Sequence, residues 1–134
     1  MSGETWNWTF YGFQTPAQNR PVQDWYGSLP DSLPSDARNE IKDILSYLQI
    51  TPNRQWVKPA VAPLGDGLFE IRYQDADYWY RIYGCYWPDG VRQVFTFLHA
   101  TTKKVKNDTD GKSLARKRKA QLQRREATVH KFEF

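Results

Sequence analysis

Cysteine, histidine and long apolar runs are all scarce in this chain. Its 134 residues include one cysteine and two histidines. One cysteine cannot form an intrachain disulfide, which fits a reducing compartment. With so few thiol and imidazole ligands, we expect neither a metal site nor another cofactor. Cys85 lies inside an aromatic segment and is predicted to be a small buried residue.

The sequence also lacks a candidate membrane span and a candidate secretion signal. No stretch approaches the roughly 18 apolar residues of a membrane span. The first residues are polar and contain no long apolar run of the kind found in a signal peptide. These absences predict a soluble cytoplasmic protein with no membrane partner. The length predicts a single domain over residues 1–134.

Aromatic residues, in contrast, are abundant, with six tryptophans and eight tyrosines in an aromatic share of 16%. In a small protein most of them are expected to fill the core. A few that remain exposed would be suited to stacking on nucleic-acid bases.

Positive charge is concentrated in one part of the chain. Residues 103–125 contain ten basic and two acidic residues, a net charge of +8, whereas the rest contains nine basic and thirteen acidic residues, a net charge of −4. Such segregation indicates a polyanionic partner more strongly than the total of +4 does. An acidic protein that neutralises the segment is the alternative.

Residue patterns predict an alternation of strands and helices. A strand is expected over 6–13 and a short helix over 22–29. Apolar residues at helical spacing predict a helix from Ser35 or Asp36 to about residue 50. Three consecutive antiparallel strands follow at 68–74, 78–87 and 91–99, with a turn at 88–90, and a basic helix is expected over 112–126. This order predicts an α+β fold, with a helical layer against a small twisted sheet.

Several strings, in their order along the chain, resemble the RelE/ParE superfamily of toxins, and most of all its HigB-like and phage-derived branch. They are PLGDGLFEIRY (63–73), YWYRIYGCYW (78–87), FTFLHATTKK (95–104) and SLARKRKAQLQRR (113–125). The resemblance covers residues 36–125. The first 35 residues, rich in tryptophan and proline, are atypical, and 103–134 forms a basic C-terminal segment. The resemblance implies a mainly antiparallel sheet with helices packed on one face and a basic C-terminal helix.

The resemblance also implies an activity and partners. Such toxins usually cut mRNA on the ribosome and are silenced by a cognate antitoxin. Metal-free RNA cleavage requires a base for the ribose 2′-OH, cations around the phosphorane and an acid for the leaving oxygen. We therefore expect a metal-independent endoribonuclease, with mRNA, the ribosome and an antitoxin as partners. The alternatives are a ParE-like DNA gyrase poison and a catalytically inactive RNA-binding phage protein.

Two arginines and two further basic residues are the candidates for catalysis. Arg72 and Arg81 lie in neighbouring predicted strands, and a planar guanidinium can bind two phosphate oxygens at once. His99 can transfer protons near neutral pH, and Lys103 can assist at the phosphate. The alternatives are ion pairs of the arginines with Glu70 or other acids, a histidine bonded to the backbone, and a solvated lysine.

RNA contact is expected along the rest of the basic segment and at one tyrosine. Counterion release makes such contacts strong and sensitive to salt. For the tyrosine, core packing is an equally good interpretation as base stacking, and for the basic helix a solvated face is the alternative. The predicted RNA-binding residues are Lys104, Lys106, Tyr83, Arg116, Arg118 and Arg124.

Overall fold

The computed structural model describes residues 5–30 and 36–134, and its centre is a six-stranded sheet. The strand order is β2-β3-β4-β5-β1-β6. All neighbours pair antiparallel except β1 and β5, which are parallel. The strands are β1 (Thr9–Gln14), β2 (Val61–Gly65), β3 (Leu68–Gln74), β4 (Trp79–Cys85), β5 (Val94–Lys103) and β6 (Thr128–Lys131).

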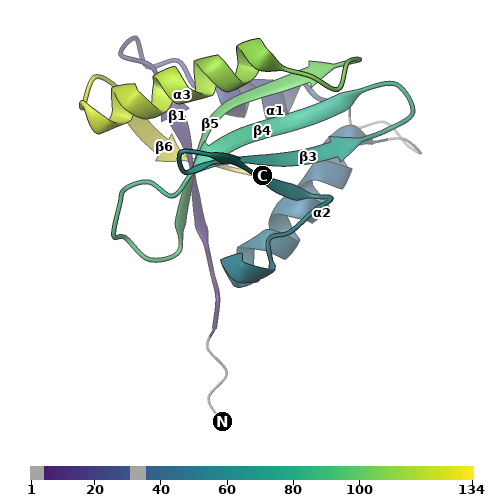
Figure 1. Ribbon diagram of the computed structural model, residues 1–134, viewed down its shortest axis with the longest axis horizontal. Coiled ribbons are helices and arrows are strands. Elements are labelled where there is room, and N and C mark those ends of the chain that lie inside the picture. Colours follow the sequence, from purple (N-terminus) through teal and green to yellow (C-terminus); the bar gives the residue numbers. More distant parts are fainter. Residues whose placement is uncertain (1–4, 31–35) are drawn as a thin grey trace.

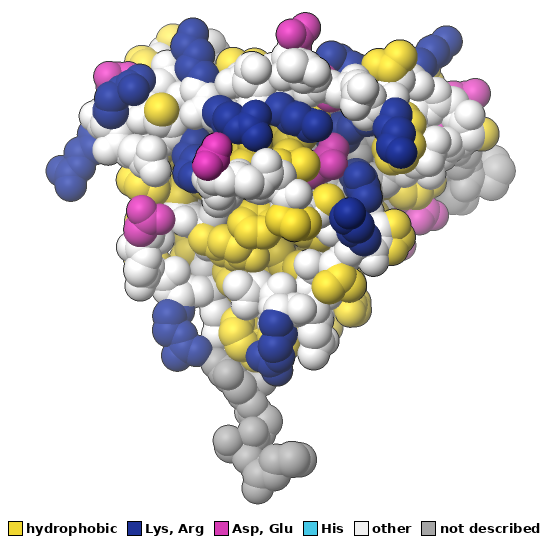
Figure 2. Space-filling view, viewed as in Figure 1, with side chains coloured by type: hydrophobic (Ala, Val, Ile, Leu, Met, Phe, Trp, Pro, Cys, Tyr) yellow, Lys and Arg dark blue, Asp and Glu magenta, His cyan; other side chains and the backbone are white. Residues whose placement is uncertain are grey.

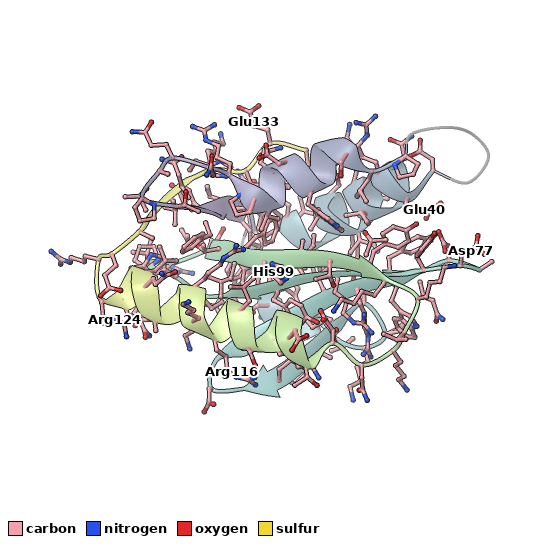
Figure 3. The ribbon with its side chains drawn as sticks, turned by 90° about the horizontal axis from the view of Figure 1, so that it is seen from above. Glu40, Asp77, His99, Arg116, Arg124 and Glu133 are labelled. Atoms are coloured by element: carbon pink, nitrogen blue, oxygen red, sulfur yellow. The ribbon has the colours of Figure 1, made fainter. Side chains whose placement is uncertain are left out.

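The helices cover both faces of this sheet. Helices α1 (Pro21–Ser28) and α2 (Ala37–Gln49) lie on one face, and α3 (Thr109–Gln123) crosses the other (Figures 1 and 3). A short 3-10 helix, η1 (Asn53–Gln55), follows α2. The predicted α+β class, with its mainly antiparallel sheet and its basic C-terminal helix, is confirmed. Among the described residues, no helix is long and apolar enough to cross a membrane.

Each face of the sheet has its own apolar cluster. The larger cluster joins α1 and α2 to the sheet and is rich in aromatic rings, such as Trp8, Trp56 and Phe97. The smaller cluster lies under α3 and includes Phe13, Tyr83 and Leu98. Side chains alternate along a strand, so neighbouring residues such as Phe97 and Leu98 reach opposite clusters. Most aromatic residues fill the core, as expected.

Helix α2 forms where the apolar spacing predicts it. The Asp36 side chain accepts a hydrogen bond from the backbone N–H of Asn39 at 3.0 Å, which satisfies one free donor of the first turn. Ala37, Ile41, Leu45 and Leu48 are buried against the sheet. Ser35, the other predicted cap, lies outside the described residues.

The sequence patterns miss two strands and one pairing. Residues 54–67 are predicted to be a connection, but Val61–Gly65 forms β2. As an edge strand, β2 tolerates Pro63, because one of its sides has no ladder to complete. Strand β6 has only four residues, too few for a clear alternation. It pairs with β1, which also pairs parallel to β5 and so lies inside the sheet.

The boundaries around β4, β5 and α3 also differ from the prediction. The predicted turn exists, with Val91 donating to Pro88 O at 3.3 Å, but β4 ends at Cys85 and β5 begins only at Val94. The connection is therefore longer than a tight hairpin. Strand β5 runs on to Lys103, and α3 begins at Thr109, three residues before the predicted start.

Candidate functional site

The register of β3, β4 and β5 brings the four predicted catalytic residues onto one face of the sheet. Arg72 on β3 is opposite Arg81 on β4, which is opposite Thr101 on β5. Two residues further along β4, Tyr83 is opposite His99, and two residues in the other direction Trp79 is opposite Lys103. Residues paired across a ladder point to the same face. This is the face that α3 covers in part.

Arg81 is buried, and its partners lie inside the protein. Its side chain is 2% exposed, and Nε lies 2.9 Å from Glu70 Oε1. The two terminal nitrogens donate to the carbonyl of Val105 at 3.2 Å, and Nη2 also donates to the carbonyl of Lys106. The ion pair with Glu70, which the sequence left open as an alternative, is therefore present. A phosphate would have to compete with it.

Arg72 is more accessible than Arg81. Its side chain is 25% exposed, and its Nη1 lies 3.5 Å from Glu70 Oε2. Nε donates to Pro59 O at 2.9 Å, which leaves Nη2 without a partner among the described residues. Glu70 thus lies between both arginines and orients them. Of the two guanidinium groups, that of Arg72 is the better placed to meet a ligand.

The carboxylate of Asp108 organises a buried polar network at the start of α3. It caps the helix by accepting from the Gly111 N–H at 3.2 Å. The same carboxylate accepts from Tyr83 Oη at 2.8 Å, Thr101 Oγ1 at 3.0 Å and Lys103 Nζ at 2.6 Å. These four donors outweigh the cost of burial and lower the pKa of Asp108 to about 2. Lys103 is therefore held at this network, with 38% of its side chain exposed.

His99 stacks on Tyr83 and faces Arg118 of α3. The two rings are nearly parallel, with centroids 6.2 Å apart. Arg118 Nη1 lies 3.3 Å from His99 Nδ1. An arginine can only donate, so Nδ1 accepts and the proton of the neutral ring is on Nε2. Burial, reinforced by Arg118, lowers the pKa of His99 to about 4, so the ring is neutral at pH 7.

The predicted RNA-binding residues fall into two groups. Tyr83 is fully buried, so it is a core residue here and not an exposed stacking platform. Arg118 is turned inward, with Nη1 donating to Leu98 O at 3.0 Å and its guanidinium over the Phe13 ring. The remaining four are exposed: Lys104, Lys106, Arg116 and Arg124. Figure 3 shows His99 in the middle of the sheet and Arg124 at the end of α3.

Two adjoining cavities open beside this face, with volumes of about 560 Å³ and 210 Å³. Both are lined by Lys58, Arg72, Trp79 and Lys106, and we call the pair the basic groove. The smaller cavity also reaches Arg81, Glu70 and Lys112. Figure 2 shows Lys and Arg side chains around a hydrophobic area in the middle of one face of the molecule. The groove therefore combines positive charge with an aromatic wall.

The described residues offer neither a cluster of metal ligands nor an accessible thiol. Across residues 5–30 and 36–134, no group of three His, Cys, Asp or Glu side chains is close enough to hold a metal ion. Cys85 is buried, as predicted, and burial raises the pKa of its thiol to about 12.

A family model described as "phage derived protein Gp49-like" matches residues 30–121. This span is more than half of the chain. The protein belongs to the Gp49-like family. That family lies within the RelE/HigB-type toxin superfamily and is commonly toxin-like in toxin–antitoxin systems. No curated protein and no solved structure matches the chain.

The Gp49-like span contains the whole candidate site. It runs from the segment before α2 to the last turns of α3, and so includes the basic groove, the Asp108 network and His99. Strand β1, helix α1 and strand β6 lie outside it. Residues 1–29 precede the matched span, and β1 from that part of the chain extends the Gp49-like sheet beyond β5.

Sequence reasoning missed three residues of the site: Lys58, Trp79 and Asp108. Lys58 lies in a segment that the patterns predict to be a connection, and nothing in its surroundings marks it. Trp79 is one of many aromatic residues in apolar strands. Asp108 offered a signal, because it is one of only two acids in the basic segment and is followed by a helix.

Proposed function

We propose that this Gp49-like protein is the toxin of a toxin–antitoxin pair and cleaves mRNA without a metal ion. RNA binds in the basic groove, and cleavage takes place on the translating ribosome. A cognate antitoxin silences it, as in the HigB-like branch that the sequence resembles. The observation that carries the proposal is the register of β3, β4 and β5, which places Arg72, Arg81, His99 and Lys103 on one face beside a positively charged groove.

The charge of the groove suits a phosphodiester. Among the described residues, the ammonium groups of Lys58, Lys106 and Lys112 pair with no carboxylate. Together with Arg72, which shares the single carboxylate of Glu70 with Arg81, they give the groove a net positive charge for an anionic ligand. Preorganised cations stabilise a phosphorane more than they stabilise the less charged ground state, and this difference lowers the barrier.

Arg72 is the arginine that we assign to the phosphate. It is exposed to the groove and held by Pro59 and Glu70, so little side-chain entropy is lost when it binds. Arg81 acts through Glu70, to which both arginines are bound. Its role is therefore to position Glu70 and, through it, Arg72.

His99 acts in this proposal as a neutral hydrogen-bond donor. With its pKa near 4, it carries no positive charge at pH 7, and its Nδ1 is occupied by Arg118. The proton on Nε2 can stabilise negative charge that develops on a phosphate oxygen. Lys103, held by Asp108 at 2.6 Å, supplies a cation on the same face.

The test is primer extension on a reporter mRNA in a reconstituted translation reaction. Wild-type protein is expected to produce discrete cuts within the reading frame, and Arg72→Ala is expected to lose them. Lys42→Ala removes an exposed cation from α2 on the opposite face and serves as the charge-matched control that still cuts. A reporter mRNA that stays intact with wild-type protein would refute the nuclease proposal. DNA breaks that depend on gyrase would then favour the ParE-like alternative.

The internal partners of Arg81 and His99 favour a second candidate function. If both side chains serve only the fold, the groove can still bind RNA without cutting it, as a catalytically inactive relative would. Induced expression in cells separates the candidates. Arrest of growth with cut messages supports the nuclease, whereas RNA recovered with the protein but uncut supports the binding protein.

A further inference from the structure

The larger cavity of the basic groove exists because β3 extends beyond the end of its pairing with β2. The register of β2 with β3 ends at Val61 and Ile71, and one further backbone hydrogen bond runs from Arg72 N–H to Ala60 O at 2.8 Å. Strand β3 continues beyond it to Gln74. The freed edge of β3 forms one wall of the cavity, and Ile44 of α2 and the segment before β2 form others. Its volume of about 560 Å³ lies within the range of small-molecule sites, roughly 300–1,000 Å³.

The charge of this cavity has one sign. Lys58, Arg72 and Lys106 line it, and among the described residues no carboxylate does. Lys58 and Lys106 are exposed and have no acidic partner there. Three cations around one opening suit a ligand with at least one phosphate group.

Trp79 makes the cavity more than a phosphate site. It lines both cavities of the groove and so stands between them. The guanidinium carbon of Arg81 lies 5.1 Å from its ring centroid, a cation–π contact that holds the indole in place. A fixed indole gives a nucleobase a rigid surface for stacking, and the nearby amide of Gln74 offers both a donor and an acceptor to a base edge.

We propose that this cavity is a nucleotide subsite for single-stranded RNA, in which one base stacks on Trp79 and its phosphate binds Lys58, Arg72 and Lys106. The inference rests on the proposed function in taking RNA as the ligand. It adds a binding position beside the predicted catalytic face, built on two residues, Lys58 and Trp79, that belong to none of the predicted sites.

The test measures binding by the full-length protein, with no cleavage step. The probe is a trinucleotide of 2′-O-methyladenosine, which cannot be cut because its 2′-oxygens are blocked. Titrations are followed by NMR through the indole N–H signals, and Trp79→Phe assigns the signal of Trp79. We expect that signal to shift, and we expect Trp79→Leu to weaken the affinity about 10-fold. Trp79→Phe keeps an aromatic surface and most of the affinity.

The charge contribution has its own variant and control. Lys58 is exposed, so Lys58→Ala leaves the fold intact. It is expected to weaken binding and to lower the slope of log affinity against log salt by about 0.7, the share of one phosphate contact on a single strand. Lys42→Ala, on the other face of the sheet, leaves both the affinity and the slope unchanged.

Several outcomes would overturn the subsite. Equal affinity of wild type, Trp79→Leu and Lys58→Ala for the trinucleotide is one. Tight binding of a hexaglutamate peptide in place of the trinucleotide is another, and it would assign the cavity to an acidic protein segment. The failure of the nuclease proposal can be told apart from the failure of the subsite. A protein that binds through Trp79 but leaves messages intact would refute the nuclease activity and support the subsite. A protein that cuts messages but binds RNA independently of Trp79 would refute the subsite and support the nuclease activity.

Discussion

Removal of Arg81 should lower the stability of the fold substantially, whatever it does to the chemistry. The Arg81 side chain is 2% exposed and is the main partner of Glu70, whose side chain is 6% exposed. Breaking a buried ion pair from one side costs about 3–5 kcal/mol, because the other charge stays buried without a partner. Arg72, 3.5 Å from Glu70, offsets part of this cost. We therefore expect Arg81→Met to lower the free energy of unfolding by about 3 kcal/mol, out of roughly 5–15 kcal/mol for a small domain.

A double-mutant cycle isolates the pair from the other contacts of Arg81. The carbonyls of Val105 and Lys106 also lose a donor, but both residues are exposed, so water can replace it. Replacing both charges, as in Glu70→Leu with Arg81→Met, leaves no unpaired charge and is often nearly neutral. We expect this double variant to be at least about 1 kcal/mol more stable than Arg81→Met alone.

Urea denaturation at pH 7, followed by circular dichroism, measures these differences. An Arg81→Met variant within about 0.5 kcal/mol of wild type would refute the reasoning, since a surface substitution typically has that effect. A double variant whose loss equals the sum of the two single losses would show that the pair is not coupled. If the cycle behaves as expected, an Arg81 variant changes the stability of the fold together with any activity, and Arg72→Ala is the more informative variant for the chemistry.

Three further predictions concern single groups. The folded-state pKa of Asp108 lies below its ordinary value, so the stability that its carboxylate contributes is complete above about pH 4 and is lost as the pH falls towards 2. The free energy of unfolding of the wild type should fall by about 2 kcal/mol over this range, whereas that of Asp108→Asn should lack this loss. The His99 ring should titrate near pH 4 in NMR spectra, and Arg118→Met should raise the pKa of His99. The stability that the neutral ring contributes should be lost as the pH falls from about 6.5 through 4. A wild-type titration midpoint near pH 6.5 would contradict this. A Cβ at Gly84 would lie 2.3 Å from the Phe95 ring, whereas one at Gly27 meets nothing within 4 Å, so thermal melting should show Gly84→Ala destabilised by about 1–3 kcal/mol and Gly27→Ala, in a helix, stabilised by about 0.5–1 kcal/mol.

Local patterns predicted the elements whose own residues determine them. The alternation of Phe69, Ile71 and Arg72 fixes the faces of β3, and its bounds, Leu68–Gln74, are as predicted. The apolar stripe and the cap at Asp36 likewise predicted α2. Strands β2 and β6 and the parallel pairing of β1 depend on partners that are distant in the sequence, and no local pattern encodes such pairings.

The candidate site was predictable in its strands but not in its contacts. Alternation and strand order suffice to place Arg72 and Arg81 side by side. Which of the two meets solvent depends on the segment after β5, whose carbonyls at Val105 and Lys106 bind Arg81. In the same way, the role of Asp108 depends on where α3 begins relative to Tyr83 and Lys103.

The chemistry of the cut ends tests the central claim most directly. In this reaction the 2′-hydroxyl loses its proton and its oxygen bonds to phosphorus, while the bond to the 5′-oxygen breaks and that oxygen takes up a proton. Metal-independent cleavage therefore leaves a 2′,3′-cyclic phosphate and a 5′-hydroxyl. The measurement is mass spectrometry of mRNA fragments from translation reactions with wild-type protein and with Arg72→Ala. We expect cyclic phosphate ends with wild type and none with the variant. Fragments that end in a 3′-hydroxyl and a 5′-phosphate, or cuts that persist in Arg72→Ala, would contradict the proposal.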